Sequence, residues 1–136
     1  MVIYLDTSAL AKLVRTEAET SALRAWLDDR AGTRLVSSSL ARVELIRAVR
    51  AEGDEAIRQA TLILVELDQM TMTMDLLDAA GALPLPLKSL DAIHLASALR
   101  LRVDLDAFVA YDKRLLTAAD QMGLPIASPG TVEPTA

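Results

Sequence analysis

The sequence predicts an α/β fold with three layers, in which a central, mainly parallel sheet lies between two layers of helices. Short apolar runs of strand character alternate along the chain with longer segments of helical spacing. Hydrophobic residues make up 52% of the sequence and aromatic residues only 3%, a composition that suits helices packed on a sheet. With 136 residues, the chain fits one compact domain with a single core.

Two strands and four helices are predicted in the N-terminal half. The strands are the apolar runs with β-branched or aromatic members, at 2–5 and 34–37. The helices are the segments with apolar residues at helical spacing, at 8–14, 17–29, 40–52 and 55–67. Short polar side chains precede the first and third helices and would cap them, and Gly53 separates the third helix from the fourth.

The C-terminal half begins with a run in which Thr alternates with Met. This alternation predicts a strand at 70–74 with its methionines packed in the core. Pro84 and Pro86 make 83–87 an irregular connector, because proline cannot donate to a strand ladder. The remaining elements are predicted at 75–82 (helix), 90–101 (helix), 107–111 (strand), 114–121 (helix) and 124–127 (strand). The domain is predicted to span 1–127, followed by a flexible tail at 128–136.

The overall charge and the residue types that are missing exclude several classes of protein. A net charge of −5 excludes a uniformly basic surface, the usual footprint of proteins that adhere to nucleic acid. It leaves open an enzyme whose acidic pocket binds cations while its Lys and Arg residues line the rim. The sequence has no cysteine, so disulfides and thiolate metal sites are excluded. No apolar run approaches the roughly 18 residues that span a bilayer, so we expect a cytoplasmic protein with no membrane partner.

Four acidic residues stand at positions where a parallel sheet gathers its ligands. Asp6 and Asp112 each follow a predicted strand, and ligands bind beyond the carboxyl ends of such strands. Asp91 lies in the first turn of its helix, where the helix dipole favours an anion. Glu44 lies in an otherwise apolar helical stretch, and a buried carboxylate there needs a partner. We therefore expect these four side chains to meet in one pocket.

Four carboxylates in one pocket would need a cation. Each pair about 5 Å apart would repel by roughly 3 kcal/mol at an effective dielectric constant near 20. Carboxylate oxygens are preferred ligands of Mg²⁺, and such a cation can activate water and stabilise charge on a phosphodiester. The pattern leaves open whether one or two ions bind. A polyanionic substrate also needs flanking basic residues, for which Arg42, Lys113 and Arg114 are candidates.

Each acid also has a simpler interpretation when it is taken singly. Asp6 or Asp112 could be only a helix cap, because aspartate is common at that position. Glu44 could pair with Arg47 or Arg42 on a solvated helix face. Only the convergence of the four acids favours a shared site.

His94 and Arg42 also have two interpretations each. His94 follows Asp91 by three residues and so lies on roughly the same helix face. We interpret it as a hydrogen-bonded structural histidine rather than a metal ligand, since oxygen ligands suit a hard ion better than imidazole does. Arg42 could contact phosphate or form a surface ion pair.

Four stretches of sequence carry a resemblance to a known family. They are YLDTSAL at 4–10, SLARVEL at 39–45, SLDAIHLA at 89–96 and YDKRL at 111–115. Together, in this order and spacing, they resemble the PIN-domain nucleases, and among those the VapC toxins of type II toxin-antitoxin systems. The resemblance covers nearly the whole chain.

This resemblance implies a fold, an activity and a set of partners. It implies a three-layer α/β/α PIN-like fold and a toxin that hydrolyses RNA as an endoribonuclease with Mg²⁺, or alternatively Mn²⁺. It implies inhibition by a VapB-like antitoxin, operator DNA bound only through that antitoxin, and a homodimer. The acidic positions of the family fall on Asp6, Glu44, Asp91 and Asp112.

The residues next to the first and last acids are also compared with the family. Thr7 and Ser8 match the polar residues that follow the first acid, and could hold it or the waters of the metal through hydrogen bonds. Ala110 departs from the pattern, because similar proteins often carry Thr or Ser there. The loss of a hydroxyl leaves the orientation of Asp112 open.

Two rival functions follow from the same residues. A haloacid-dehalogenase-like phosphatase also places Asp after its first strand, but it would need a second Asp where this chain has Ser8. A non-catalytic RNA-binding or interaction module with the same fold is the other alternative. Retention of all four acids argues against it.

Overall fold

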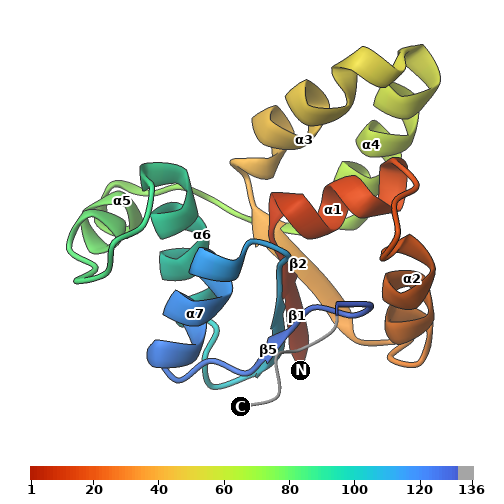
Figure 1. Cartoon of the computed structure of the whole chain (residues 1–136). Coiled ribbons are helices and arrows are strands. Elements are labelled where there is room, and N and C mark those ends of the chain that lie inside the picture. The colour runs from red at the N-terminus through yellow and green to blue at the C-terminus, as the bar shows by residue number, and fades with distance from the viewer. Residues whose placement is uncertain (132–136) are drawn as a thin grey trace.

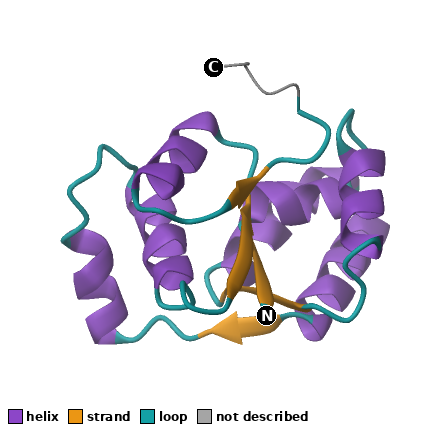
Figure 2. Ribbon diagram, turned by 90° about the horizontal axis from the view of Figure 1, so that it is seen from below, coloured by secondary structure: helices purple, strands orange, loops and turns teal. Residues whose placement is uncertain are grey.

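The computed structural model describes residues 1–131 and contains a parallel five-stranded sheet covered by helices on both sides (Figures 1 and 2). The strands are β1 (Val2–Leu5), β2 (Arg34–Ser38), β3 (Asp68–Met70), β4 (Leu105–Val109) and β5 (Ile126–Ala127). The helices are α1 (Thr7–Val14), α2 (Thr20–Asp28), α3 (Ala41–Val49), α4 (Asp54–Glu66), α5 (Met74–Gly81), α6 (Ser89–Leu99) and α7 (Lys113–Gln121), with a 3-10 turn η1 (Arg50–Glu52) after α3.

Alternating side chains of β1 separate the two helical layers. Ile3 and Leu5 belong to an apolar cluster with residues of α1, α2, α3 and α4. Val2 and Tyr4 belong to a second cluster with residues of α6 and α7 on the other face. Both faces of the sheet are therefore buried, as is usual for parallel sheets. The predicted three-layer α/β/α architecture is confirmed.

The order of the strands changes direction between β1 and β4. The sheet runs β3-β2-β1-β4-β5, so the chain moves outwards from β1 in one direction and from β4 in the other. Helix α1, which follows β1, and helix α7, which follows β4, consequently pack on opposite faces. Such a switch point leaves a crevice at the carboxyl ends of the strands, where ligands of α/β proteins bind.

The boundaries of three predicted strands are wrong. The third strand is Asp68–Met70 rather than 70–74, because Thr73 instead caps α5 by accepting a hydrogen bond from the backbone of Leu76. The fourth ends at Val109, because the Tyr111 backbone N–H donates to Ser8 Oγ instead of continuing the ladder. The last strand begins at Ile126, since Leu124 N bonds back to Ala119 at the end of α7.

The methionines and the irregular segments give mixed outcomes. Met70 and Met72 pack partly buried against the core, as predicted, but Met74 is 80% exposed, so the prediction for Met74 is wrong. The connector 83–87 is irregular, as its prolines predict. The predicted tail at 128–136 includes 132–136, which lie outside the described residues. Before that point, the Pro129 carbonyl accepts a hydrogen bond from Tyr111 Oη at 2.7 Å.

No helix in residues 1–131 is both long enough and apolar enough to span a membrane.

Candidate active site

Asp6 lies directly after β1 and is buried, with only 4% of its surface exposed. Its backbone nitrogen extends the ladder by donating to the Val109 carbonyl at 3.1 Å. Its Oδ1 atom accepts hydrogen bonds from Ser8 Oγ at 2.6 Å and from the Ala9 backbone at 3.0 Å, which caps α1. Burial raises the pKa of Asp6 to about 6, and the negative charge of Asp91 adds to that rise. The predicted contact between Ser8 and the first acid is present.

Asp112 occupies the matching position after β4, at the start of α7. Its Oδ1 accepts a hydrogen bond from the Leu115 backbone at 3.1 Å, and the side chain is exposed. Ala110 is buried in the apolar cluster beside α6 and α7 and does not prevent this cap. Asp6 and Asp112 are therefore both helix caps, and each cap uses one carboxylate oxygen, so capping and a role in a site are compatible.

Glu44 is held from two other elements. Its Oε1 atom accepts a hydrogen bond from Thr7 Oγ1 at 2.7 Å and lies 2.7 Å from His94 Nε2. These bonds hold the pKa of Glu44 below its usual value, although partial burial opposes them. The partners of this carboxylate are therefore Thr7 and His94, and not Arg47 or Arg42. Thr7 was expected to hold the first acid or the waters of the metal, and in the structure its hydroxyl donates to Glu44.

His94 is buried, with 1% of its surface exposed, and both ring nitrogens are engaged. Nδ1 lies 2.7 Å from Tyr4 Oη, and Nε2 faces Glu44. The prediction of a hydrogen-bonded histidine near the acids is confirmed. Sequence reasoning missed Tyr4, whose place in a strand gave no sign that its hydroxyl would meet a residue 90 positions away.

Asp91 connects the four acids electrostatically. It lies in the first turn of α6 and is half-buried. Burial raises the pKa of Asp91, and the charges of Asp112 and Glu44 raise it further. Since Asp91 also raises the pKa of Asp6, it interacts with all three other acids. Among the described residues, its side chain accepts no hydrogen bond from the protein.

The chemistry of these four side chains suits a hard divalent cation. All of the candidate donors are carboxylate oxygens, and the mutual repulsion felt by Asp91 is the kind that a cation relieves. In residues 1–131, no three side chains of Asp, Glu, His or Cys already stand close enough to one another to hold a metal ion. The donor set therefore fits the ion by its chemistry, and the carboxylates would have to draw closer around it.

Basic residues border two of the acids. A cavity of about 420 Å³ is lined by Asp91 and Asp112 together with Lys88, Lys113 and Arg114, with Pro86 and Leu87 between them. Lys113 and Arg114 were expected near the site, whereas Lys88 was missed, although it precedes Asp91 by only three residues. Arg42 is exposed on α3, and no ion pair to it occurs within residues 1–131.

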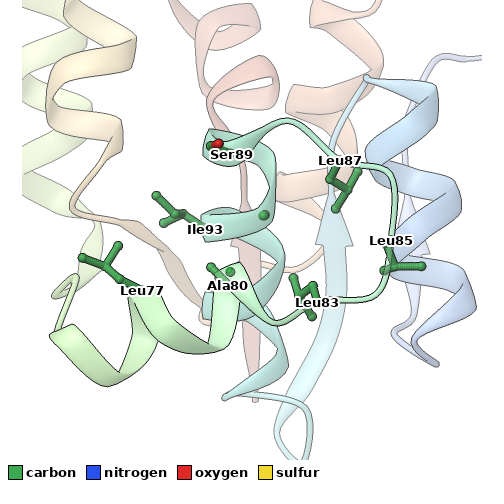
Figure 3. Close-up of a pocket in the computed structure, with 9 residues that line it drawn as sticks. Leu77, Ala80, Leu83, Leu85, Leu87, Ser89 and Ile93 are labelled. Carbon is green, nitrogen blue, oxygen red and sulfur yellow. The ribbon is translucent and has the colours of Figure 1, made fainter.

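A second hollow of about 390 Å³ lies between α5, α6 and the connector 83–87 (Figure 3). Its lining is mainly aliphatic, and Ser89 supplies the only side-chain hydroxyl among the lining residues: Leu77, Ala80, Gly81, Leu83, Leu85, Leu87, Ser89, Ala92 and Ile93. It contains no acid, base or metal ligand. This hollow therefore offers no groups for acid-base or metal chemistry, in contrast to the cavity beside Asp91 and Asp112.

The sequence and the fold are similar to those of known proteins. A family model of the PIN domain matches residues 3–121. Ribonuclease VapC35 of Mycobacterium tuberculosis is 45% identical over 132 residues, which make up 95% of this chain and 98% of that relative.

Two solved structures share the fold. One is VapC20 of Mycobacterium tuberculosis, described as a sarcin-ricin loop cleaving toxin, with a TM-score of 0.74, 19% identity and coverage of 93% of this chain and 99% of that chain. The other is VapBC2 of Rickettsia felis bound to a DNA fragment from their promoter, with a TM-score of 0.69, 14% identity and coverage of 95% and 99%. The family match and the 45% identity together show that this chain belongs to the PIN-domain family, among the VapC proteins.

Proposed function

We propose that this protein is the toxin of a type II toxin-antitoxin system and acts in the cytoplasm as a metal-dependent endoribonuclease. The observation that carries the proposal is the cavity that Asp91 and Asp112 line together with the basic residues Lys88, Lys113 and Arg114. The ribonuclease name of VapC35 and its 45% identity over almost the whole chain support the same activity.

The four acids would hold Mg²⁺, for which Mn²⁺ could substitute. When bound, the cation would lower the pKa of a water molecule and stabilise charge on the phosphodiester being hydrolysed. In each of Asp6, Glu44 and Asp112, one carboxylate oxygen accepts hydrogen bonds from the protein, which fixes the carboxylate in place. Their other oxygens accept no hydrogen bond from residues 1–131 and are left for the ion.

The substrate would be RNA, held by the basic residues at the edge of the acidic site. Lys88, Lys113 and Arg114 line the same cavity as Asp91 and Asp112, so a phosphate bound by them would lie beside the acids. These cations offset the repulsion between the carboxylates and a polyanion. Arg42, exposed on α3, would contribute a further phosphate contact.

The partners follow from the relatives. We infer that a VapB-like antitoxin inhibits this chain and that operator DNA is bound only through that antitoxin, with the toxin as a homodimer. The structure of VapBC2 bound to a DNA fragment from their promoter supports an antitoxin partner and promoter DNA as a ligand of the complex. VapC20, which cleaves the sarcin-ricin loop, supports a structured RNA as the class of substrate.

Cleavage of RNA by the purified chain tests the proposal. Total RNA incubated with the parent protein should be cut when Mg²⁺ is present and remain intact with EDTA, and the Asp6→Asn protein should leave it intact in both. Sequencing of the new RNA ends would identify the cleavage site. RNA binding without cleavage, equal for both proteins, would instead favour the alternative of a non-catalytic interaction module.

A further inference from the structure

A buried chain of hydrogen bonds runs behind the acids through three elements. Tyr4 Oη on β1 lies 2.7 Å from His94 Nδ1 on α6, and His94 Nε2 lies 2.7 Å from Glu44 Oε1 on α3. Tyr4 and His94 are 0% and 1% exposed. Because a buried polar group without a partner is costly, the hydrogen bond between Tyr4 and His94 stabilises both groups.

This chain of hydrogen bonds reaches three of the four segments that carry an acid. Tyr4 precedes Asp6 by two residues on β1, and His94 follows Asp91 by one helical turn on α6. The last of these hydrogen bonds is made to Glu44 itself. We propose that Tyr4 and His94 are positioning residues, which fix the Glu44 carboxylate and set its place relative to Asp6 and Asp91 for cation binding. This inference rests on the proposed function.

The hydrogen-bond partners of the two ring nitrogens of His94 decide which nitrogen carries hydrogen. An ionised carboxylate can only accept, so Nε2 must carry the hydrogen that faces Glu44. In the neutral ring Nδ1 then accepts, and its donor is Tyr4 Oη. Thr7 Oγ1 donates to the same Glu44 oxygen, so two donors hold that one atom. Glu44 is thereby left with its second oxygen for a ligand.

The aromatic packing around Tyr4 allows its hydroxyl to be removed alone. The Tyr4 ring stacks on Phe108 with centroids 5.4 Å apart, and its edge meets the His94 ring at 5.9 Å. A Tyr4→Phe variant keeps these ring contacts and loses the hydroxyl, which donates to Nδ1 and also lies beside polar groups of Ser37, Ser38 and Ser97. His94→Leu removes both bonds, whereas His94→Gln retains an N–H group that can reach Glu44.

The first measurement concerns the tautomer of the metal-free protein. His94 is the only histidine in the sequence, so its two imidazole ¹⁵N signals need no assignment by mutation. We expect hydrogen on Nε2 alone in the parent protein and also in Tyr4→Phe, because Glu44 still faces Nε2, but the Nδ1 signal should move in Tyr4→Phe because that nitrogen loses its donor. Hydrogen on Nδ1 in the parent protein, or the same spectrum in both proteins, would overturn the assignment.

The second measurement is the affinity for Mn²⁺ alone, by titration calorimetry. Loss of the group that orients a metal-binding side chain typically weakens binding by 10- to 100-fold. We expect a Kd for Mn²⁺ raised about 10-fold or more by His94→Leu, raised less by Tyr4→Phe, and largely restored by His94→Gln.

Thr20→Val is the matched control for a lost buried hydroxyl. Thr20 is 4% exposed, and its hydroxyl bonds where α1 leads into α2: it donates to the carbonyls of Lys12 and Arg15 and accepts from the Glu17 backbone nitrogen. It should lose stability as Tyr4→Phe does and keep the parent Kd. Parent-like Kd values in His94→Leu would overturn the positioning role while leaving the proposed function intact. A parent protein that does not bind Mn²⁺ would contradict both.

Discussion

The hydroxyl of Ser8 donates to Asp6 Oδ1 at 2.6 Å and accepts from the Tyr111 backbone nitrogen at 2.9 Å. The ladder between β1 and β4 ends at this point, so a side chain replaces strand pairing. Ser8 thereby ties the first acid to the segment that leads into Asp112. This hydroxyl therefore helps to fix the spacing of these two acids at the switch point, together with the bond from the Asp6 backbone nitrogen to the Val109 carbonyl.

Ser8→Ala should therefore lower the stability of the fold. Removal of the hydroxyl leaves the Tyr111 N–H without its acceptor and takes one donor from Asp6, for an expected loss of about 1–3 kcal/mol in the free energy of unfolding. Urea denaturation measures the loss. Thr61→Ala is the control, because its hydroxyl bonds within the exposed part of α4 and should change stability by about 0.5 kcal/mol or less. Equal losses in the two variants would contradict the role of Ser8.

Asp6→Asn should stabilise the metal-free protein at neutral pH. The folded pKa of Asp6 is about 6 against an ordinary value of 3.8, so stability is greatest while the carboxyl is neutral and falls as pH rises through 6. This rise corresponds to about 3 kcal/mol at most, and Asn cannot ionise but can still accept at Oδ1. With EDTA present, the variant should gain about 1–3 kcal/mol at pH 7.5 and much less at pH 4. A variant less stable than the parent protein at pH 7.5 would contradict the prediction.

Mg²⁺ should stabilise the parent protein more than it stabilises Asp6→Asn. A cation held by the ionised acids stabilises the folded state by about 2.7 kcal/mol at 100 times its Kd, and binding displaces the proton from Asp6. The melting temperature of the parent protein should rise with Mg²⁺ at pH 7.5, rise less at pH 5.5, and return to its starting value with EDTA. Asp6→Asn should respond little at either pH. A shift of the same size in Asp6→Asn would show that the cation binds elsewhere.

Lys88→Ala should weaken RNA binding more than it slows the chemical step. Lys88 lines the cavity of Asp91 and Asp112, so its loss removes one phosphate contact. We expect a several-fold rise in KM and a decrease of about 0.7 in the slope of log K against log salt for single-stranded RNA. Arg102→Ala removes an equal charge from the loop beside the opposite end of β1, where Asp104 accepts from Val2. The same change in both variants would indicate a general effect of net charge.

The sheet and the positions of the acids could be predicted because they follow from local patterns. Strand and helix periodicities alternate along the chain, and Asp6 and Asp112 come after apolar runs that form adjacent strands. The third strand was misplaced because alternating Thr and Met resembles a strand locally. In the folded chain, the register of β3 beside β2 and the cap at Thr73 place the strand earlier.

The contacts behind the acids could not be predicted, because they join residues far apart in sequence. Thr7 and Glu44 are separated by 37 positions, and His94 and Glu44 by 50. No periodicity relates such residues, and they meet only when α1, α3 and α6 pack around the same sheet edge. The contribution of Lys88 likewise depends on the path of the connector before α6, which its prolines make irregular.

Mg²⁺-dependent cleavage of RNA by Asp91→Asn, measured beside the parent protein, tests the four-acid site most directly. Asp91 accepts no hydrogen bond from residues 1–131 and is only half-buried, so the variant should fold as the parent protein does, which circular dichroism checks. We predict a rate lower by about 100-fold or more, equivalent to about 2.7 kcal/mol of lost transition-state stabilisation. Cleavage at the parent rate by the folded variant would contradict the site.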